Sequence, residues 1–358
     1  MVFSQITTTP GEVSSIAIKT DYVSDPVAIF SSLTQKSQYA LLLESAEIDS
    51  KDNLKSLVVL DTAVTFECNG AQVEIKAVNP NGQCVVEHLT EIFNLDYPKV
   101  LVNDSTPLSL SLTFLPTNTQ TDEDERLKQV NAFEALRAAI NTIAHNEADE
   151  FSLFLAGTFA YDMLANFESL PEVTGGLNTC PDYVFYLAET VLVIDHQSKT
   201  SEIIGNIFSG PQAYANCFAV GKRIEEINDR IKASTSVDAT YGYHLSQHEQ
   251  EVEINVSDEA FKQKVVELKQ NIVEGDIFQV VPSRCFSLEC QSPLDAYRHL
   301  KHDNPSPYMF YLLHPDFSLF GASPESALKF NSQDRQVEVY PIAGTRKRGF
   351  NADGRLDL

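Results

Sequence analysis

A short basic segment near the end of the sequence combines residue types that could hold an anion. Residues 340–349 read Tyr-Pro-Ile-Ala-Gly-Thr-Arg-Lys-Arg-Gly, so a hydroxyl and three cations follow two small residues. Gly344 has no side chain to keep a ligand from the backbone. Backbone N–H groups of such a turn, with the Thr345 hydroxyl, can point at one carboxylate or phosphate oxygen. These residues leave two interpretations open: a small-anion site, or a solvated turn after an edge strand.

The overall charge of the chain makes this basic segment conspicuous. The sequence has 26 Lys+Arg against 50 Asp+Glu, a net charge of -24. Such a charge repels nucleic acid and anionic membrane surfaces, so neither is an expected partner. A cluster of cations on an acidic protein instead attracts small anions.

Polar residues also stand at the ends or in the middle of apolar stretches. Glu44 and Ser45 directly follow the apolar run 39–43, Gln279 lies inside Ile-Phe-Gln-Val-Val, and residues 304–310 (NPSPYMF) join a turn to an aromatic strand. A buried polar group needs a hydrogen-bond partner. A shared ligand pocket and strand-capping hydrogen bonds are the two explanations that the residues allow.

Several common types of site are absent from the sequence. It contains no Walker A loop, no G-x-G-x-x-G and no G-x-S-x-G motif. The closely spaced pairs His244/His248 and His299/His302 do not form a recognisable zinc pattern. The six cysteines are scattered without a C-x-x-C pair, which indicates free thiols in a reducing cytoplasm.

Apolar periodicity predicts the elements that must position these residues. A helix should begin after the cap Ser257 and end at Gly275. Neither a signal peptide nor an apolar run long enough to span a membrane is expected. Strands are predicted at 39–45, 56–65, 72–77, 151–161, 182–196, 276–288 and 337–340, and further helices at 127–140 and 211–232.

Several longer motifs resemble a known family. EGDIFQVVPSR, NPSPYMF, FGASPES and YPIAGTRKRG resemble the chorismate-utilising enzymes. LLLESAEIDSKDNLKSL, FAYD at 159–162 and CPDYVFYLAETVLVIDHQ at 180–197 resemble the large subunits (component I) of anthranilate synthase in particular. The resemblance runs in order from about residue 20 to the end of the sequence.

This resemblance implies an α+β fold of stacked antiparallel sheets with helices packed between them. It assigns residues 20–200 to the N-terminal, tryptophan-regulatory region. Residues 201–255 would be a helix and linker, and residues 256–358 the first part of the chorismate-binding catalytic domain.

The resemblance also implies an activity. The family's large subunit is a lyase that converts chorismate and ammonia to anthranilate and pyruvate with Mg²⁺, the first step of tryptophan biosynthesis. A glutamine amidotransferase subunit (component II) supplies the ammonia from glutamine, in a heterotetramer of two large and two small subunits. Tryptophan inhibits as the end product, and the expected location is the cytoplasm.

Site residues follow from the matching motifs. Gly344 and Thr345 match residues that bind a chorismate carboxylate, which agrees with the anion-site interpretation. The expected tryptophan pocket has an indole slot lined by Tyr308 and Met309 and polar groups that meet the amino-acid end. The matching residues of that pocket are Glu44, Ser45, Lys55, Pro307, Tyr308 and Met309.

Two positions separate subfamilies by mechanism. Relatives that add water carry a lysine base where this chain has Gln279, and aminodeoxychorismate synthases carry a lysine nucleophile where it has Ala343. Without either lysine, ammonia is expected to attack chorismate directly. Aminodeoxychorismate synthase component I, which Ala343 disfavours, is the alternative enzyme. A tryptophan-binding fragment without catalysis is the alternative of another class.

The family's sequence continues beyond Leu358. The missing part carries the Mg²⁺-ligand glutamates and the catalytic histidine, so no metal ligand is expected within this chain. A fragment, a truncation and a frameshift would each explain such an end, and the 358 residues alone are expected to be inactive.

Overall fold

The structure is a computed structural model, and its residues form two compact units. It describes residues 6–45, 54–115, 122, 124–125, 128–145, 150–166, 168, 180–234, 251–340 and 349. The first unit comprises Met1–Ala239 and Tyr297–Ala322, and the second comprises Thr240–Ala296 and Ser323–Leu358. The domain ranges expected from the sequence stay a prediction.

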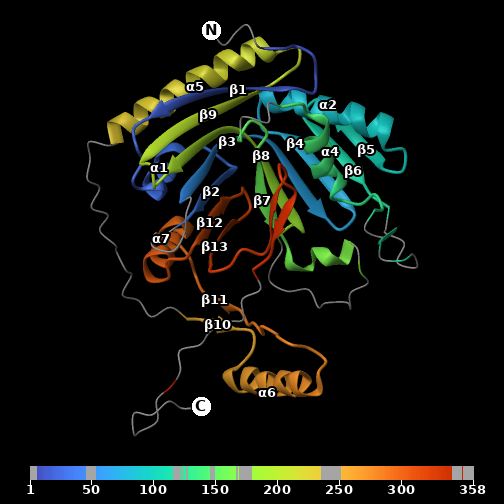
Figure 1. Ribbon diagram of the computed structural model, residues 1–358, viewed down its shortest axis with the longest axis vertical. Coiled ribbons are helices and arrows are strands. Elements are labelled where there is room, and N and C mark those ends of the chain that lie inside the picture. The colour runs from blue at the N-terminus through green and yellow to red at the C-terminus, as the bar shows by residue number, and fades with distance from the viewer. Residues whose placement is uncertain are drawn as a thin grey trace. The chain divides into compact units, whose positions relative to one another are not determined.

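The first unit is built on one antiparallel sheet, and the fold is α+β as predicted (Figure 1). Within the described residues this sheet has eleven strands, with β1-β9-β8-β3-β2-β12-β13 as its main path and β4, β5, β6 and β7 as branches. The strands are β1 Val13–Thr20, β2 Ala40–Glu44, β3 Lys55–Asn69, β4 Gln72–Ala77, β5 Leu101–Thr106, β6 Ser109–Thr113, β7 Leu155–Phe159, β8 Tyr183–Asp195, β9 Thr200–Phe208, β12 Tyr308–Leu313 and β13 Ser318–Ser323.

The two long central strands, β3 and β8, belong to both halves of this sheet. Near one end they pair with β2 and β9, and near the other with β4 and β7. Between these ends, the register of β3 on β8 shifts at Val59/Asp61, Asp61/Thr62 and Thr62/Val64. Such bulges bend a strand and increase its twist, so one pair of strands can serve two differently oriented halves.

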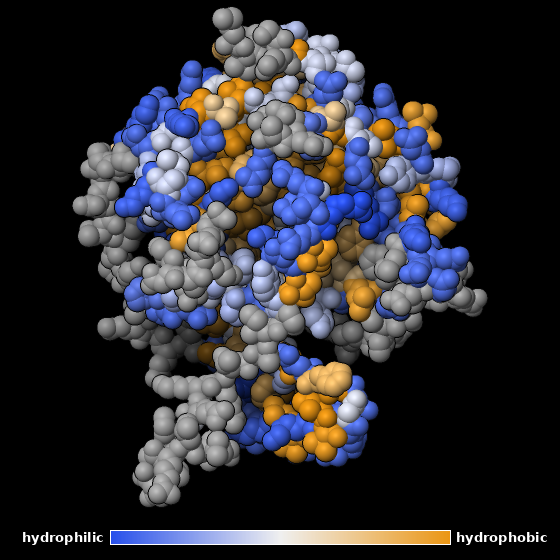
Figure 2. All heavy atoms as spheres, in the orientation of Figure 1, coloured by the Kyte–Doolittle hydropathy of each residue, from blue (hydrophilic) through white to orange (hydrophobic). Residues whose placement is uncertain are grey.

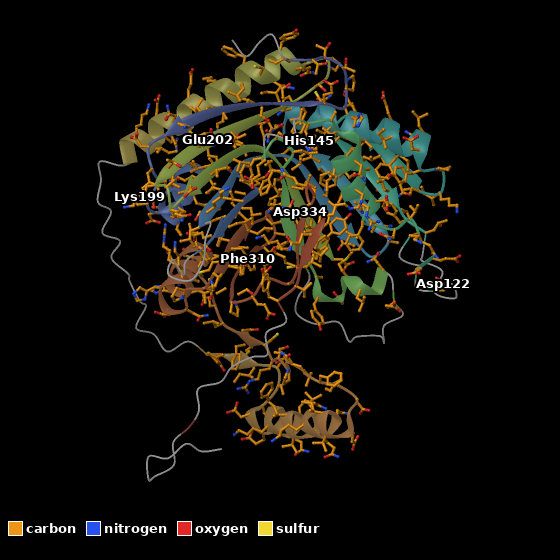
Figure 3. The ribbon with its side chains drawn as sticks, viewed as in Figure 1. Asp122, His145, Lys199, Glu202, Phe310 and Asp334 are labelled. Carbon is orange, nitrogen blue, oxygen red and sulfur yellow. The ribbon has the colours of Figure 1, made fainter. Side chains whose placement is uncertain are left out.

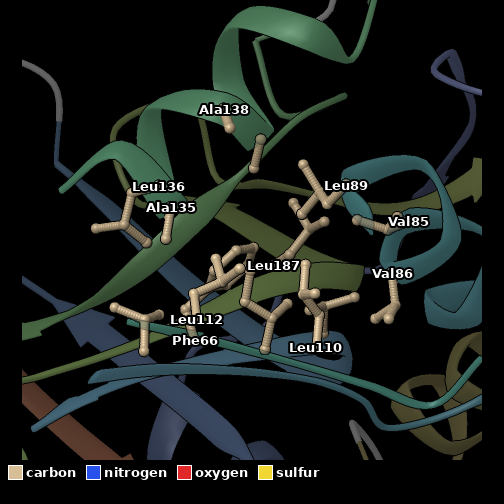
Figure 4. Close-up of a cluster of buried hydrophobic side chains, with 14 of the residues drawn as sticks. Phe66, Val85, Val86, Leu89, Leu110, Leu112, Ala135, Leu136, Ala138 and Leu187 are labelled. Carbon is tan, nitrogen blue, oxygen red and sulfur yellow. The ribbon is translucent and has the colours of Figure 1, made fainter. Parts of the chain in front are cut away.

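Helices of this unit pack on one face of the sheet. Helix α5 (Ala213–Ser234) runs along β1 and β9 (Figure 1), while α1 (Pro26–Leu33) packs on β2 and β3. Helices α2 (Pro80–Asp96) and α4 (Glu134–Thr142) cover the half with β4 and β6. Figure 4 shows their apolar side chains meeting those of the strands, and burial of such surface is the main stabilising term. The residues labelled there are Phe66, Val85, Val86, Leu89, Leu110, Leu112, Ala135, Leu136, Ala138 and Leu187.

On the opposite face the two halves of the sheet are tied together by side chains. The Tyr186 hydroxyl on β8 donates to the backbone oxygen of Leu313 at the end of β12, at 2.8 Å. Three residues beyond the last register shift of β3, which ends at Val64, the Glu67 carboxylate lies 3.3 Å from Nε2 of His314. A second apolar cluster, containing Leu41, Val59, Tyr186, Val193 and Leu312 among others, fills this face.

The second unit contains small pieces of secondary structure. Helix α6 (Asp258–Glu274) begins where the Ser257 hydroxyl accepts from Ala260 N at 3.2 Å, and ends at Gly275 with φ +85°, which confirms the predicted caps. Apolar side chains of α6 such as Val266 and Val273 are exposed, and orange residues are visible around it in Figure 2. The other elements are β10 Glu253–Ile254, β11 Phe286–Ser287, β14 Lys329–Asn331 and β15 Gln336–Glu338. Helix α7 (Pro293–Asp303) begins in this unit and ends in the first one.

The structure confirms most predicted elements and corrects three. The strand predicted at 151–161 is confined to β7, Leu155–Phe159. The strand predicted at 276–288 is wrong, because only Phe286 and Ser287 pair, with β10, and Phe278 is fully exposed. Alternating apolar residues form a strand only where a neighbour offers a ladder of hydrogen bonds. Helix α4 begins at Glu134, later than the periodicity from residue 127 suggests. None of the helices that the structure describes has both the length and the apolar character needed to cross a bilayer.

The start of α2 packs directly on β3, and Gly82 makes this close approach possible. A Cβ atom at Gly82 would lie 1.9 Å from the backbone oxygen of Ala63. We expect Gly82→Ala to lower the free energy of unfolding by about 1–3 kcal/mol, because backbone must move. Gly221→Ala in α5 is the control, since nothing lies near its Cβ and alanine favours the helix by about 0.5–1 kcal/mol. Urea unfolding measures both, and equal midpoints would contradict the packing described.

A carboxylate is largely buried where the long strands bend. Glu189 lies between Ala188 and Thr190 in the irregular segment of β8, and Asn81 Nδ2 donates to its Oε2 at 2.9 Å. Burial, helped by the nearby Asp61 carboxylate, raises the pKa of Glu189 to about 7 in spite of the hydrogen bond from Asn81, which lowers it. The protonated form of Glu189 is therefore the one that the fold favours.

This shift gives the stability of the fold a pH dependence. Because the folded pKa lies above the unfolded one, the contribution of Glu189 is complete at low pH and is lost as pH rises through about 7. We expect Glu189→Gln to stabilise the chain relative to the parent by about 3 kcal/mol more near pH ~8 than near pH ~4. Unfolding curves across this range measure it, with the exposed Glu225→Gln as control. A pH-independent difference would contradict the assignment.

Candidate functional site

One cavity of about 520 Å³ opens on the sheet face opposite the helices of the first unit. Its walls come from the ends of β2, β3 and β12 and from β7, segments far apart in the sequence. The cavity is lined by Leu41, Leu43, Glu44, Ser45, Lys55, Leu57, Gly157, Thr158, Phe159, Pro307, Tyr308, Met309 and Phe310. All six residues expected for a tryptophan pocket are among them.

Strand register explains why the floor of this cavity is apolar. Leu43 pairs with Leu57 on β3 and with Phe310 on β12, so these three side chains lie side by side on one face. Leu41 pairs with Val59 in the same way, two residues further from the end of β2. Strand β7 forms the facing wall, with Thr158 and Phe159. The arrangement is a slot with aliphatic and aromatic sides.

Polar groups gather at the mouth of the slot. Extending the register of β2 by two residues places Ser45 opposite Lys55 and Tyr308 on the same face as the floor. The Ser45 hydroxyl donates to the backbone oxygen of Pro307 at 2.7 Å, which ties the end of β2 to the start of β12. The Lys55 ammonium lies 3.3 Å from a Glu150 carboxylate oxygen in a pair that is largely exposed. Such pairs contribute little stability, so a ligand's carboxylate can replace Glu150.

Glu44 and Met309 line the cavity differently. They pair with each other across β2 and β12, and alternation places both side chains on the opposite face from Leu43 and Phe310. The Glu44 carboxylate is buried there and accepts from Tyr297 Oη and Lys301 Nζ of α7, each at 2.5 Å. Burial raises the pKa of Tyr297, and the Glu44 carboxylate raises it further. Glu44 and Met309 therefore line the cavity with their backbone atoms.

A second cavity, of about 380 Å³, shares Lys55 with the first and lies on the same face over β1, β8 and β9. It is lined by charged and hydroxyl side chains, including Glu202, Asp195 and Glu150. In Figure 3 Glu202, from β9, and Phe310, from β12, mark these two regions of the sheet. Lys55, which is paired with Glu150 of the polar cavity, thus lines both the polar and the apolar cavity.

The remaining predicted residues are placed elsewhere. Gln279 lies in an exposed loop of the second unit rather than in a strand. Ala343, Gly344 and Thr345 fall outside the described residues. Nothing within the described part of the chain groups three or more His, Cys, Asp or Glu side chains so that they could hold a metal ion. All six cysteines are free, as their spacing predicts.

Sequence reasoning missed part of the cavity. Leu41, Leu43 and Ser45 are each two positions apart. This period of two could have identified the face of the strand that lines the cavity. Tyr297 and Lys301 are one helical turn apart in α7. Nothing in the sequence indicates that they contact Glu44; the structure shows this contact. The β7 wall was predicted as a strand, but nothing in its sequence indicates what it faces.

Comparison with known proteins identifies the family. The family description "chorismate binding enzyme" matches residues 97–357. The chain is 45% identical to anthranilate synthase component 1 of Vibrio cholerae and 42% identical to that of Escherichia coli, each match covering 94% of this chain and 62% of the relative. A solved structure of anthranilate synthase component I from Streptococcus pneumoniae matches with 18% identity and a TM-score of 0.46, over 80% of this chain and 53% of that one.

The chain belongs to the chorismate binding enzyme family. The two curated relatives named above are each called anthranilate synthase component 1, and the motifs of the sequence predict this similarity. The chain spans about 62% of the length of these relatives.

Proposed function

We propose that the first unit binds L-tryptophan in the cavity between β2, β3, β12 and β7, as the feedback inhibitor of an anthranilate synthase large subunit. One observation carries the proposal. Glu44–Ser45, Lys55 and Pro307–Met309 come from three separate segments, and all of them line this cavity.

The chemistry of the cavity suits an aromatic amino acid. The indole ring would lie in the slot beside Leu57 and Phe310, where apolar surface leaves water. The amino-acid end would lie at the mouth, where Lys55 supplies a cation and Ser45 a hydroxyl for the carboxylate. The cavity volume falls within the range of about 300–1,000 Å³ usual for small-molecule sites.

For the whole protein we propose the activity of its named relatives, in the cytoplasm. Chorismate and ammonia would give anthranilate and pyruvate with Mg²⁺, and a glutamine amidotransferase component would supply the ammonia in a heterotetramer of two large and two small subunits. Gly344 and Thr345 would hold a chorismate carboxylate, and the Mg²⁺ ligands would lie outside this chain. The 358 residues alone would form no anthranilate even with excess ammonia, which a fluorescence assay for anthranilate tests.

The sequence makes tryptophan binding simple to measure. The chain contains no tryptophan, so the indole fluorescence of the ligand is free of protein background. Selective excitation of the indole should give a saturable increase in anisotropy on titration with the chain. D-Tryptophan is the control for recognition of the amino-acid end. The absence of a saturable change in anisotropy with L-tryptophan would contradict the proposal. Turnover of chorismate without tryptophan binding would favour an aminodeoxychorismate synthase.

Filling the mouth of the slot should weaken L-tryptophan binding. We expect Ser45→Phe to weaken L-tryptophan binding by at least about tenfold, since the new ring occupies the slot and removes the hydroxyl that bonds Pro307. The exposed Ser105 on β5, outside the cavity lining, provides the matched control Ser105→Phe, which should bind as the parent does. Anisotropy titration compares the two, and equal affinities of Ser45→Phe and the parent would contradict the assigned pocket.

A further inference from the structure

The side chain of Glu44 is engaged on the face away from the cavity. Its carboxylate has two donors, the Tyr297 hydroxyl and the Lys301 ammonium, and its side chain is only 2% exposed. Tyr297 is fully buried. A carboxylate held in this way is satisfied without a ligand. Turning it into the cavity would leave the buried Tyr297 hydroxyl and the partly exposed Lys301 ammonium without their partner.

This cluster lies where the strands stop. Strand β2 ends at Glu44 and β12 begins at Tyr308, so the ladder of backbone hydrogen bonds between them ends at the pair Glu44–Met309. Ser45 and Tyr308, at the mouth of the slot, are the next residues along each strand. Their positions depend on whatever holds the two strand ends. The hydrogen bonds from α7 to Glu44 supply that restraint, together with the Ser45–Pro307 bond.

Helix α7 is itself well anchored at this point. Tyr297 packs against Tyr311 of β12, with ring centroids 5.6 Å apart, and Tyr311 stacks on Phe320 of β13 at 5.9 Å and 16°. Tyr297 and Lys301 are one turn apart on the helix and reach the two oxygens of the same carboxylate. The cluster therefore joins a rigid aromatic layer to the end of β2.

We propose that Tyr297 and Lys301 are positioning residues of the tryptophan cavity. They hold the Glu44 carboxylate, and Glu44 in turn fixes the ends of β2 and β12 that carry Ser45 and Tyr308. Glu44 then influences ligand affinity through the strand ends and does not contact the ligand's ammonium group. The identity of the ligand in this inference rests on the proposed function. The hydrogen bonds from Tyr297 and Lys301 to Glu44 do not depend on it.

A double-mutant cycle separates this role from direct contact. Glu44→Gln and Lys301→Leu should each weaken L-tryptophan binding by about tenfold, the loss of one charge-assisted hydrogen bond, and the double variant should be no weaker than either. Lys301→Arg should retain most of the affinity. The double variant has no unpaired buried charge, so it keeps the test available if Lys301→Leu folds poorly. Additive losses would mean that Glu44 contacts the ligand, and unchanged affinities would remove the positioning role; either overturns the proposal.

A second measurement needs no ligand. The sequence has only three methionines, Met1, Met163 and Met309, so methionine-methyl NMR gives few signals. Met309 pairs with Glu44, whereas Met163 lies in the 3₁₀ helix η2 (Tyr161–Asn166) and serves as internal reference. Lys301→Leu should shift or broaden the Met309 signal and leave that of Met163 unchanged. If the parent binds no tryptophan, the proposed function fails and this signal still decides the inference: an unperturbed Met309 overturns it.

Discussion

The candidate site depends on the bulged pairing of β3 with β8. These two strands are long enough to serve both halves of the sheet, and the register shifts between Val59 and Val64 let each half take its own orientation. Without that bend, β7 could not face the ends of β2 and β12 across a cavity. The bend also has a cost, because it buries Glu189 with its pKa raised to about 7.

Because side chains alternate along β2 and β12, one face of the sheet lines the cavity and the other packs against α7. Residues 41, 43 and 45 of one strand, with Tyr308 and Phe310 of the other, present aliphatic, aromatic and hydroxyl groups to the cavity. Glu44 and Met309 alternate with them and pack towards α7. A shift of one residue in register would exchange these faces and destroy the slot. The side-chain bonds at the strand ends are therefore as important as the cavity walls.

Sequence reasoning predicted those parts of the fold whose signal is local. The apolar strands at 39–45, 56–65 and 182–196 and the capped helix after Ser257 are confirmed, because their periodicity and caps lie within one segment. The strand predicted around Gln279 failed, because pairing depends on a neighbour that a local pattern does not reveal. For the site, family motifs grouped Ser45, Lys55 and Tyr308. Nothing local could show that Glu44 faces α7, since this follows from the register of distant strands.

The central claim is that the bent sheet forms a slot for an aromatic amino acid. A crystal structure of the chain grown with L-tryptophan tests this most directly. The account predicts the indole between the Leu57–Phe310 floor and β7, the carboxylate within hydrogen-bond reach of Lys55 and Ser45, and the Glu44 carboxylate still bonded to Tyr297 and Lys301. Ligand found in the polar cavity beside Glu202, or a Glu44 carboxylate turned onto the ligand's ammonium group, would contradict it.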